Sequence, residues 1–169
     1  CSTLWKGPDM MLKTAKILKQ IGVEFEWNVC GHMPNEYRMI VEYHEGISFR
    51  ETEINILGMT PPDQLADLLC HSTIYVHTSY IDNSPNSICE AQCIGIPIIS
   101  TNVGGISSLI HNGIDGILVP ANDPYQMAFQ IVTLCSDTKR LRELSESAKA
   151  KAMERHRSEN ILVDRKSTR

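Results

Sequence analysis

Two carboxylates flank a segment whose residue types predict the start of a helix. The stretch SYIDNSPNSICEAQCIGIPIIS, residues 79–100, places Asp82 before the Ser84-Pro85 pair and Glu90 eight positions after Asp82. Ser84 is a favoured N-cap residue, and Pro85 suits the first helical position. We therefore expect a helix to begin at Pro85, between the two acids.

The first turn of this helix has the chemistry of an anion site. Asn86 and Ser87 follow the expected N-cap, and N–H groups at a helix start have no intrahelical partner. Together with the helix dipole, these groups attract a phosphate. Glu90 could accept hydrogen bonds from the vicinal hydroxyls of a ribose, and Asp82 could bind a second hydroxyl group. The four residues would outline a sugar-nucleotide site, with a turn-forming Asp82 and a solvated Glu90 as the structural alternative.

Composition restricts the class of protein. The chain has 169 residues, of which 42% are hydrophobic, enough for one domain with a full core. Sixteen basic against twenty acidic side chains argue against a nucleic-acid partner. Six cysteines without a CxxC pair predict buried thiols in a reducing, cytoplasmic compartment. Scattered histidines predict no metal site, and no apolar stretch approaches the ~20 residues of a membrane span.

The elements that would position the acids alternate along the chain. Strand patterns occupy residues 23–31, 53–58, 72–79, 97–101 and 116–119, and helical patterns occupy 6–22, 35–45, 60–70, 84–95, 106–113, 123–137 and 138–155. This alternation predicts a Rossmann-like, doubly wound α/β domain, a parallel sheet with helices on both faces. Such sheets bind ligands at the carboxyl ends of their strands, where the loop containing Asp82 lies.

Three sets of residues are interpreted as structural. The basic residues between 138 and 155 alternate with acids and predict a solvated helix face. His77, at a strand end, could reach the cleft but is interpreted as a packed histidine. Cys89 and Cys93 are predicted to be core thiols.

The segment around Glu90 resembles a known signature. DNSPNSICEAQCIGIPII, followed by TNVGG, resembles the C-terminal lobe of GT-B glycosyltransferases of family 4, whose motif spaces two acids eight positions apart ahead of a Gly-Gly turn. The positions in register are Pro85, Asn86, Glu90, Ala91, Gly95, Pro97, Gly104 and Gly105. The resemblance extends to KGPDMMLKTAKILK and to LIHNGIDGILVPANDP, and it reaches about residue 136.

The resemblance implies roles for individual residues. Glu90 matches the acid that binds the ribose, and Asp82 stands where the family usually has a Glu that contacts the donor sugar. Lys6, next to Gly7, matches the basic residue that neutralises the leaving diphosphate. The resemblance places the distal phosphate on the amides of Asn86 and Ser87. The resemblance places Gly58 and Met59 at the nucleotide base. The remaining donor-binding positions that it implies are Gly7, Asn83, Ser84, Pro85, Gly104 and Gly105.

Two positions depart from the family pattern. The Arg usually found five residues before the Lys is Cys1 here, so the second phosphate cation is lost or comes from elsewhere. The acid that follows the Gly-Gly turn in the family is replaced by Ser107 and Ser108.

The resemblance implies a donor-binding domain of a retaining, metal-independent hexosyltransferase. Such an enzyme moves a sugar from a nucleotide-diphosphate sugar to a glycan or lipid-linked acceptor in cell-surface polysaccharide synthesis, in the cytoplasm, with peripheral contact to the inner membrane face as an option. We expect residues 1–155 to form this lobe without its first strand, and residues 156–169 to be a frayed extension. The acceptor would bind a separate N-terminal domain, and the lobe alone would transfer no sugar.

Other functional classes remain open. A non-catalytic sugar-nucleotide-binding domain or a GT-B-fold epimerase would use similar nucleotide contacts. A dinucleotide-binding oxidoreductase would need a G-x-G-x-x-G motif after an early strand, and VCGHMPN contains a single glycine.

Overall fold

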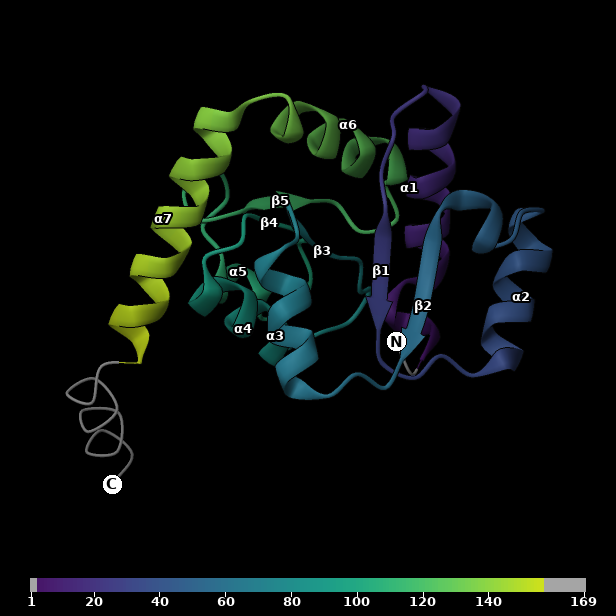
Figure 1. The fold of residues 1–169 in the computed structure, drawn as a ribbon, viewed down its shortest axis with the longest axis horizontal. Coiled ribbons are helices and arrows are strands. Elements are labelled where there is room, and N and C mark those ends of the chain that lie inside the picture. Colours follow the sequence, from purple (N-terminus) through teal and green to yellow (C-terminus); the bar gives the residue numbers. More distant parts are fainter. Residues whose placement is uncertain (1–2, 157–169) are drawn as a thin grey trace.

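The computed structural model describes residues 3–156 as alternating strands and helices (Figure 1). The helices are α1 (Pro8–Gln20), α2 (Asn35–Glu45), α3 (Pro62–Cys70), α4 (Asn86–Ile94), α5 (Ile106–Leu109), α6 (Pro124–Cys135) and α7 (Thr138–Arg155), with 3-10 turns η1 (Leu4–Lys6) and η2 (Arg50–Thr52). The strands are β1 (Trp27–Cys30), β2 (Ile54–Gly58), β3 (Tyr75–His77), β4 (Ile98–Thr101) and β5 (Ile117–Val119). Every predicted helix and strand is confirmed, with shorter strands than the patterns indicate.

All strand pairs are parallel, but they form two sheets. β1 pairs with β2, and β4 lies between β3 and β5. Within the described residues β1 and β3 share no hydrogen-bonded ladder, so the predicted parallel, helix-covered arrangement is present as two sheets. The two sheets meet through side chains instead, since Trp27 of β1 and Val76 of β3 pack against the same apolar cluster. Periodicity predicts that a strand exists, and it does not say which strand lies beside it.

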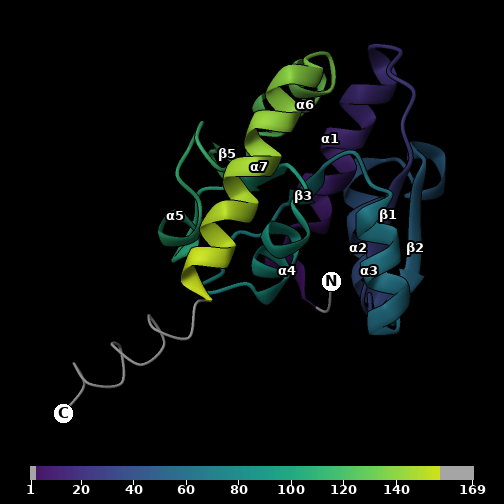
Figure 2. The same ribbon diagram turned by 60° about the vertical axis from the view of Figure 1, so that its left-hand side comes forward.

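Helices cover the three-stranded sheet on both faces. Figure 1 shows α6 on one side of β3, β4 and β5, with α4 and α5 on the other. Figure 2 shows α7 running in front of this unit from α6 towards α4 and α5, and α7 packs closely against α4. α1 joins the two sheets, because Leu18 contacts the α6 cluster while Leu12 packs with Val29 of β1. The layers are those of a doubly wound α/β domain.

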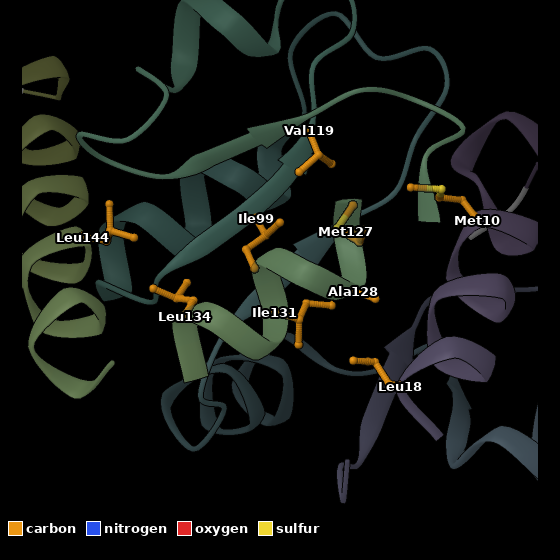
Figure 3. Packing of buried hydrophobic residues seen from close by; sticks show 9 residues of the cluster. All are labelled: Met10, Leu18, Ile99, Val119, Met127, Ala128, Ile131, Leu134 and Leu144. Atoms are coloured by element: carbon orange, nitrogen blue, oxygen red, sulfur yellow. The ribbon is translucent and has the colours of Figure 1, made fainter. Parts of the chain in front are cut away.

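The largest buried cluster lies under α6. Figure 3 shows Ile99 of β4 and Val119 of β5 facing Met127 of α6, with Leu18 of α1 approaching Ile131. Ile99 and Met127 have no exposed surface. This core holds the strands in place and brings their carboxyl ends to one edge.

Local signals explain where the helices begin. Pro8 occupies the first turn of α1 and follows Gly7 in the left-handed conformation. Asp123 and Asp137 cap α6 and α7 by accepting hydrogen bonds from the backbone N–H groups of Gln126 and Arg140. The prediction for α4 is wrong by one residue: Pro85 has an extended backbone (ψ 114°), so it is the N-cap and the helix begins at Asn86.

The basic residues of α7 are less solvated than predicted. Arg140 donates to the carbonyl of Gly113, and Arg155 donates to the side chain of Gln92. Lys151 pairs with the buried carboxylate of Asp115, with 2.8 Å between Nζ and Oδ2. The basic face therefore attaches α7 to the rest of the domain, which alternating charge alone could not indicate.

Of these contacts, the one made by Asp115 should contribute most to the stability of the domain. Asp115 is 2% exposed, and its carboxylate also accepts a 2.7 Å hydrogen bond from the backbone N–H of His111. Asp115→Asn removes the charge opposite Lys151, so we expect the free energy of unfolding to fall by about 2 kcal/mol in urea denaturation. Glu143→Gln, which breaks exposed pairs on α7, should cost only about 0.5 kcal/mol. Equal losses for the two variants would contradict this account.

Other expectations have mixed outcomes. The prediction of buried thiols is wrong for Cys70, Cys93 and Cys135, whose residues are exposed, while Cys30 and Cys89 are half-buried. Cys1 and residues 157–169, most of the expected extension, lie outside the described residues. Within 3–156, no helix combines the length and hydropathy that a membrane span requires.

Candidate functional site

Three loops meet at the carboxyl end of β3. The first leads from η1 into α1 through Gly7, the second runs from β3 to α4, and the third is the Gly104-Gly105 turn after β4. Thr78 donates from its hydroxyl to the carbonyl of Lys6, and the N–H of Tyr80 donates to Trp5. These bonds attach the first loop to the second.

Glycines allow the close approach of these loops. Gly7 has φ +71°, and a Cβ there would lie 2.0 Å from the carbonyl oxygen of Thr78. Gly104 and Gly105 are similar. A Cβ at Gly104 would lie 2.1 Å from the backbone oxygen of Asp82, and one at Gly105 would lie 2.0 Å from the backbone oxygen of Asn83. The N–H of Gly105 also donates to the Asp82 carbonyl. Only glycine fits at these contacts, so the Gly-Gly turn fixes the backbone beside Asp82.

Lys6 and Asp82 form an ion pair across the first two loops. The distance from Lys6 Nζ to Asp82 Oδ2 is 2.5 Å, with side chains 37% and 10% exposed. A carboxylate so little exposed requires a partner, and the half-buried Lys6 supplies one. The two residues are 76 positions apart in sequence. The structure therefore brings together the basic residue of the predicted site, Lys6, and its first acid, Asp82.

His77 is a further member of the site, although its sequence position predicts a packed histidine. Its Nε2 lies 3.3 Å from Asp82 Oδ2, and the residue is 7% exposed. This nitrogen is buried without a well-aligned hydrogen bond among the described residues, so the contact is close in distance but poor in direction. Burial lowers the pKa of His77, Lys6 lowers it further, and Asp82 opposes both. The ring is therefore neutral at pH 7.

Tyr75 continues the cluster towards α4. Its hydroxyl lies 3.4 Å from Nδ1 of His77. Burial raises the pKa of Tyr75 to about 12, against the hydrogen bond from Ser87, and the charges of Glu90 and Asp82 raise it as well. Tyr75 thus stays protonated next to the first turn of α4. The signal in the sequence was the i, i+2 spacing of Tyr75 and His77, which places both side chains on one face of β3.

The start of α4 has no side-chain cap among residues 3–156. The N–H of Ile88 donates to the carbonyl of Pro85, whereas the N–H groups of Asn86 and Ser87 have no partner within the helix. Asn86 is exposed, Ser87 is half-buried, and Glu90 is exposed one turn further along. The amides and the dipole favour an anion at this end of the helix.

The predicted contacts to the nucleotide base, Gly58 and Met59, lie at the end of β2 in the two-stranded sheet. Gly58 ends β2, and its carbonyl accepts from the N–H of Gly31 and the hydroxyl of Thr60. Met59 is 80% exposed. The described hydrogen bonds join neither residue to α4. At the second departure from the family pattern, Ser108 donates to the carbonyl of Gly105 at the base of the turn.

The arrangement contains no evident metal centre. Among residues 3–156, no group of three or more His, Cys, Asp or Glu side chains is placed to hold a metal ion. The site offers one ammonium group, two carboxylates, an imidazole and free backbone amides. It can neutralise an anionic ligand and hydrogen-bond hydroxyl groups without a bound ion.

Comparison with known families agrees with the signature. The family described as "Glycosyl transferases group 1" matches residues 1–137. This chain belongs to that family. A putative colanic acid biosynthesis glycosyltransferase, WcaL, from Salmonella typhimurium is 28% identical over 134 residues, which cover 75% of this chain and 32% of the relative. N-acetyl-alpha-D-glucosaminyl L-malate synthase from Bacillus anthracis is 32% identical over 110 residues, covering 65% of this chain and 29% of the relative. The chain thus spans about a third of the curated relatives that it matches.

Solved structures of group 1 transferases and related enzymes share the fold. Anabaena HepE, in a crystal structure with UDP and glucose, has a TM-score of 0.80 at 21% identity and covers 99% of this chain, which spans 46% of HepE. The C-terminal domain of a group 1 family protein (LpcC) from Francisella tularensis has a TM-score of 0.78 at 16% identity over 93% of this chain and 83% of that domain. At these identities the likeness shows the fold alone. The chain has the fold of one lobe of a GT-B glycosyltransferase, as the resemblance implies.

Proposed function

We propose that this domain binds the nucleotide-diphosphate sugar of a retaining hexosyltransferase. The observation that carries the proposal is the Lys6–Asp82 pair, held by the Gly-Gly turn beside the uncapped start of α4. Membership of the group 1 family supports it, and so does the crystal structure of HepE in complex with UDP-glucose, since HepE shares this fold.

The chemistry needs the charges that the site offers. Breaking a glycosyl–phosphate bond builds negative charge on the diphosphate, which Lys6 and the amides of Asn86 and Ser87 would stabilise without a metal. Glu90 would accept hydrogen bonds from the ribose, and Asp82 from the transferred sugar. Gly58 and Met59 would contact the base from the neighbouring sheet.

The acceptor and the setting are also proposals. Relatives named for colanic acid and amylovoran biosynthesis support a role in polysaccharide synthesis, with a glycan or lipid-linked acceptor. We propose that the acceptor binds a separate N-terminal domain and that this lobe alone transfers no sugar. The enzyme would work in the cytoplasm, with peripheral contact to the membrane as an option.

Among residues 3–156, β1 and β3 each have one edge without a hydrogen-bonded partner strand, which suggests one more strand in the whole protein. Side chains of both strands already pack against one cluster. A parallel strand that precedes α1 would reach this position through a right-handed connection. It would hydrogen-bond to β1 on one side and β3 on the other, forming one sheet.

Calorimetric titration with UDP, GDP and ADP tests the proposed donor site. We expect one of the three to bind, and Glu90→Gln to weaken that binding about tenfold, because a ribose hydroxyl loses a charged acceptor. Inorganic pyrophosphate, which has no ribose, should bind equally to both proteins. Glu36→Gln, an exposed acid in the first turn of α2, is the matched control. No binding of any diphosphate to a folded sample would overturn the proposal.

A further inference from the structure

One oxygen of Asp82 serves two partners. Oδ2 lies 2.5 Å from Lys6 Nζ and 3.3 Å from His77 Nε2. If a diphosphate binds at α4, Lys6 is the cation that must turn towards it. Asp82 is only 10% exposed, so it would then remain in a poorly hydrated place with a weakened ion pair.

His77 is the group placed to replace that charge. Its buried Nε2 lies 3.3 Å from the same oxygen and lacks a well-aligned partner among the described residues. Its other nitrogen lies 3.4 Å from the Tyr75 hydroxyl, which can donate to Nδ1. The proton on the ring therefore belongs on Nε2 in the neutral form, facing Asp82.

We propose that His77 takes up a proton when a diphosphate draws Lys6 away from Asp82, and so keeps the carboxylate in position for the sugar. This inference rests on the proposed function. His77 acts through Asp82, so it is a positioning residue and does not contact the donor.

The charges around the ring set the direction of the change. Lys6 from η1 and burial lower the pKa of His77, and Asp82 from the following loop raises it. Tyr75 from the same strand stays protonated, because burial raises its pKa and Glu90 of α4 and Cys30 of β1 raise it further. Moving Lys6 towards two phosphates removes a lowering effect and adds negative charge, so the pKa rises. Between the free and bound values, binding takes up a proton, and affinity falls as pH rises through that window.

A pH titration by NMR tests the coupling without any ligand. The ring signal of His77, assigned by its loss in His77→Gln, should titrate at higher pH in Lys6→Met than in the native protein. Lys139→Met, which changes an exposed lysine on α7, should leave the titration unchanged. An unshifted His77 signal in Lys6→Met would overturn the proposal even if nucleotides bind.

Calorimetry in buffers of different ionisation enthalpy tests proton uptake with UDP, GDP and ADP. The terminal phosphate of each nucleotide itself titrates at about 6, so the comparison is made between variants. His77→Gln keeps an N–H donor near Nε2 but cannot take up a proton; it should bind, with uptake lowered relative to the native protein. His71→Gln, an exposed histidine beside Asp67, should retain the full uptake. Binding with equal uptake in native protein and His77→Gln would overturn this proposal alone, whereas no binding would overturn the proposed function and this inference with it.

Discussion

Gly7→Ala is expected to lower the free energy of unfolding by about 3 kcal/mol. The left-handed backbone of Gly7 (φ +71°) costs a residue with a Cβ about 1–2 kcal/mol. The added methyl group would also lie 2.0 Å from the carbonyl oxygen of Thr78, and overpacking costs a further 1–3 kcal/mol or so. The Thr78 hydroxyl donates to the backbone carbonyl of Lys6, so a shift of either loop would also move the backbone that carries the ammonium group. Urea denaturation measures the loss.

Gly22→Ala is the matched control. Gly22 has nearly the same backbone (φ +75°), but a Cβ there meets nothing within 4 Å. It should therefore cost only the conformational part, about 1 kcal/mol. If the two variants lost the same stability, the close packing of the first two loops would not be what makes Gly7 necessary.

Lys6→Met should weaken diphosphate binding about 100-fold. It removes the single ammonium group beside Asp82 that we assign to the phosphates, and a charge-assisted hydrogen bond contributes roughly 1.5–3 kcal/mol. The loss should be larger at low salt, since screening weakens partly exposed charges. Calorimetric titration with UDP, GDP and ADP measures it. Lys19→Met, which changes a lysine in the last turn of α1 that is paired with Glu53, should leave binding unchanged.

Asp82→Asn separates the two roles within the pair. It frees Lys6 from its ion pair, so binding of the bare nucleoside diphosphate should be as tight as in the native protein or tighter. The sugar nucleotide should lose the additional affinity that its sugar provides, because the amide is a poorer acceptor than the carboxylate. A parallel loss for both ligands would show that Asp82 acts on the phosphates or on the fold.

Much of the fold could be predicted because its signals are local. Pro8 after Gly7 and the caps at Asp123 and Asp137 define helix starts over a few residues. The spacing of Asp82, Glu90 and the Gly-Gly turn could be compared with a family directly. The one-residue error at Pro85 arose because proline suits the first helical position, whereas the extended backbone of Pro85 makes it the N-cap, which only the backbone angles show.

The rest depends on contacts between distant residues. The Lys6–Asp82 pair joins positions 76 apart, and the sequence predicted each residue without their contact. His77 has an ordinary strand position, and its place in the site depends on the turn that returns Asp82 to it. The separation of β1 from β3 likewise depends on strand neighbours, which periodicity does not determine. The buried partners of Arg155 and Lys151, which are Gln92 and Asp115, are likewise distant from α7 in the sequence.

Amide chemical-shift mapping on 15N-labelled protein tests whether a diphosphate binds between the start of α4 and the Gly-Gly turn. The nucleoside diphosphate that binds by calorimetry is titrated in at pH 7. We expect the largest saturable shifts at Asn86 and Ser87 at the start of α4 and at Gly104 and Gly105, with one shared half-saturation point. Saturable binding that leaves these amides unmoved, with the largest shifts elsewhere in the domain, would contradict it.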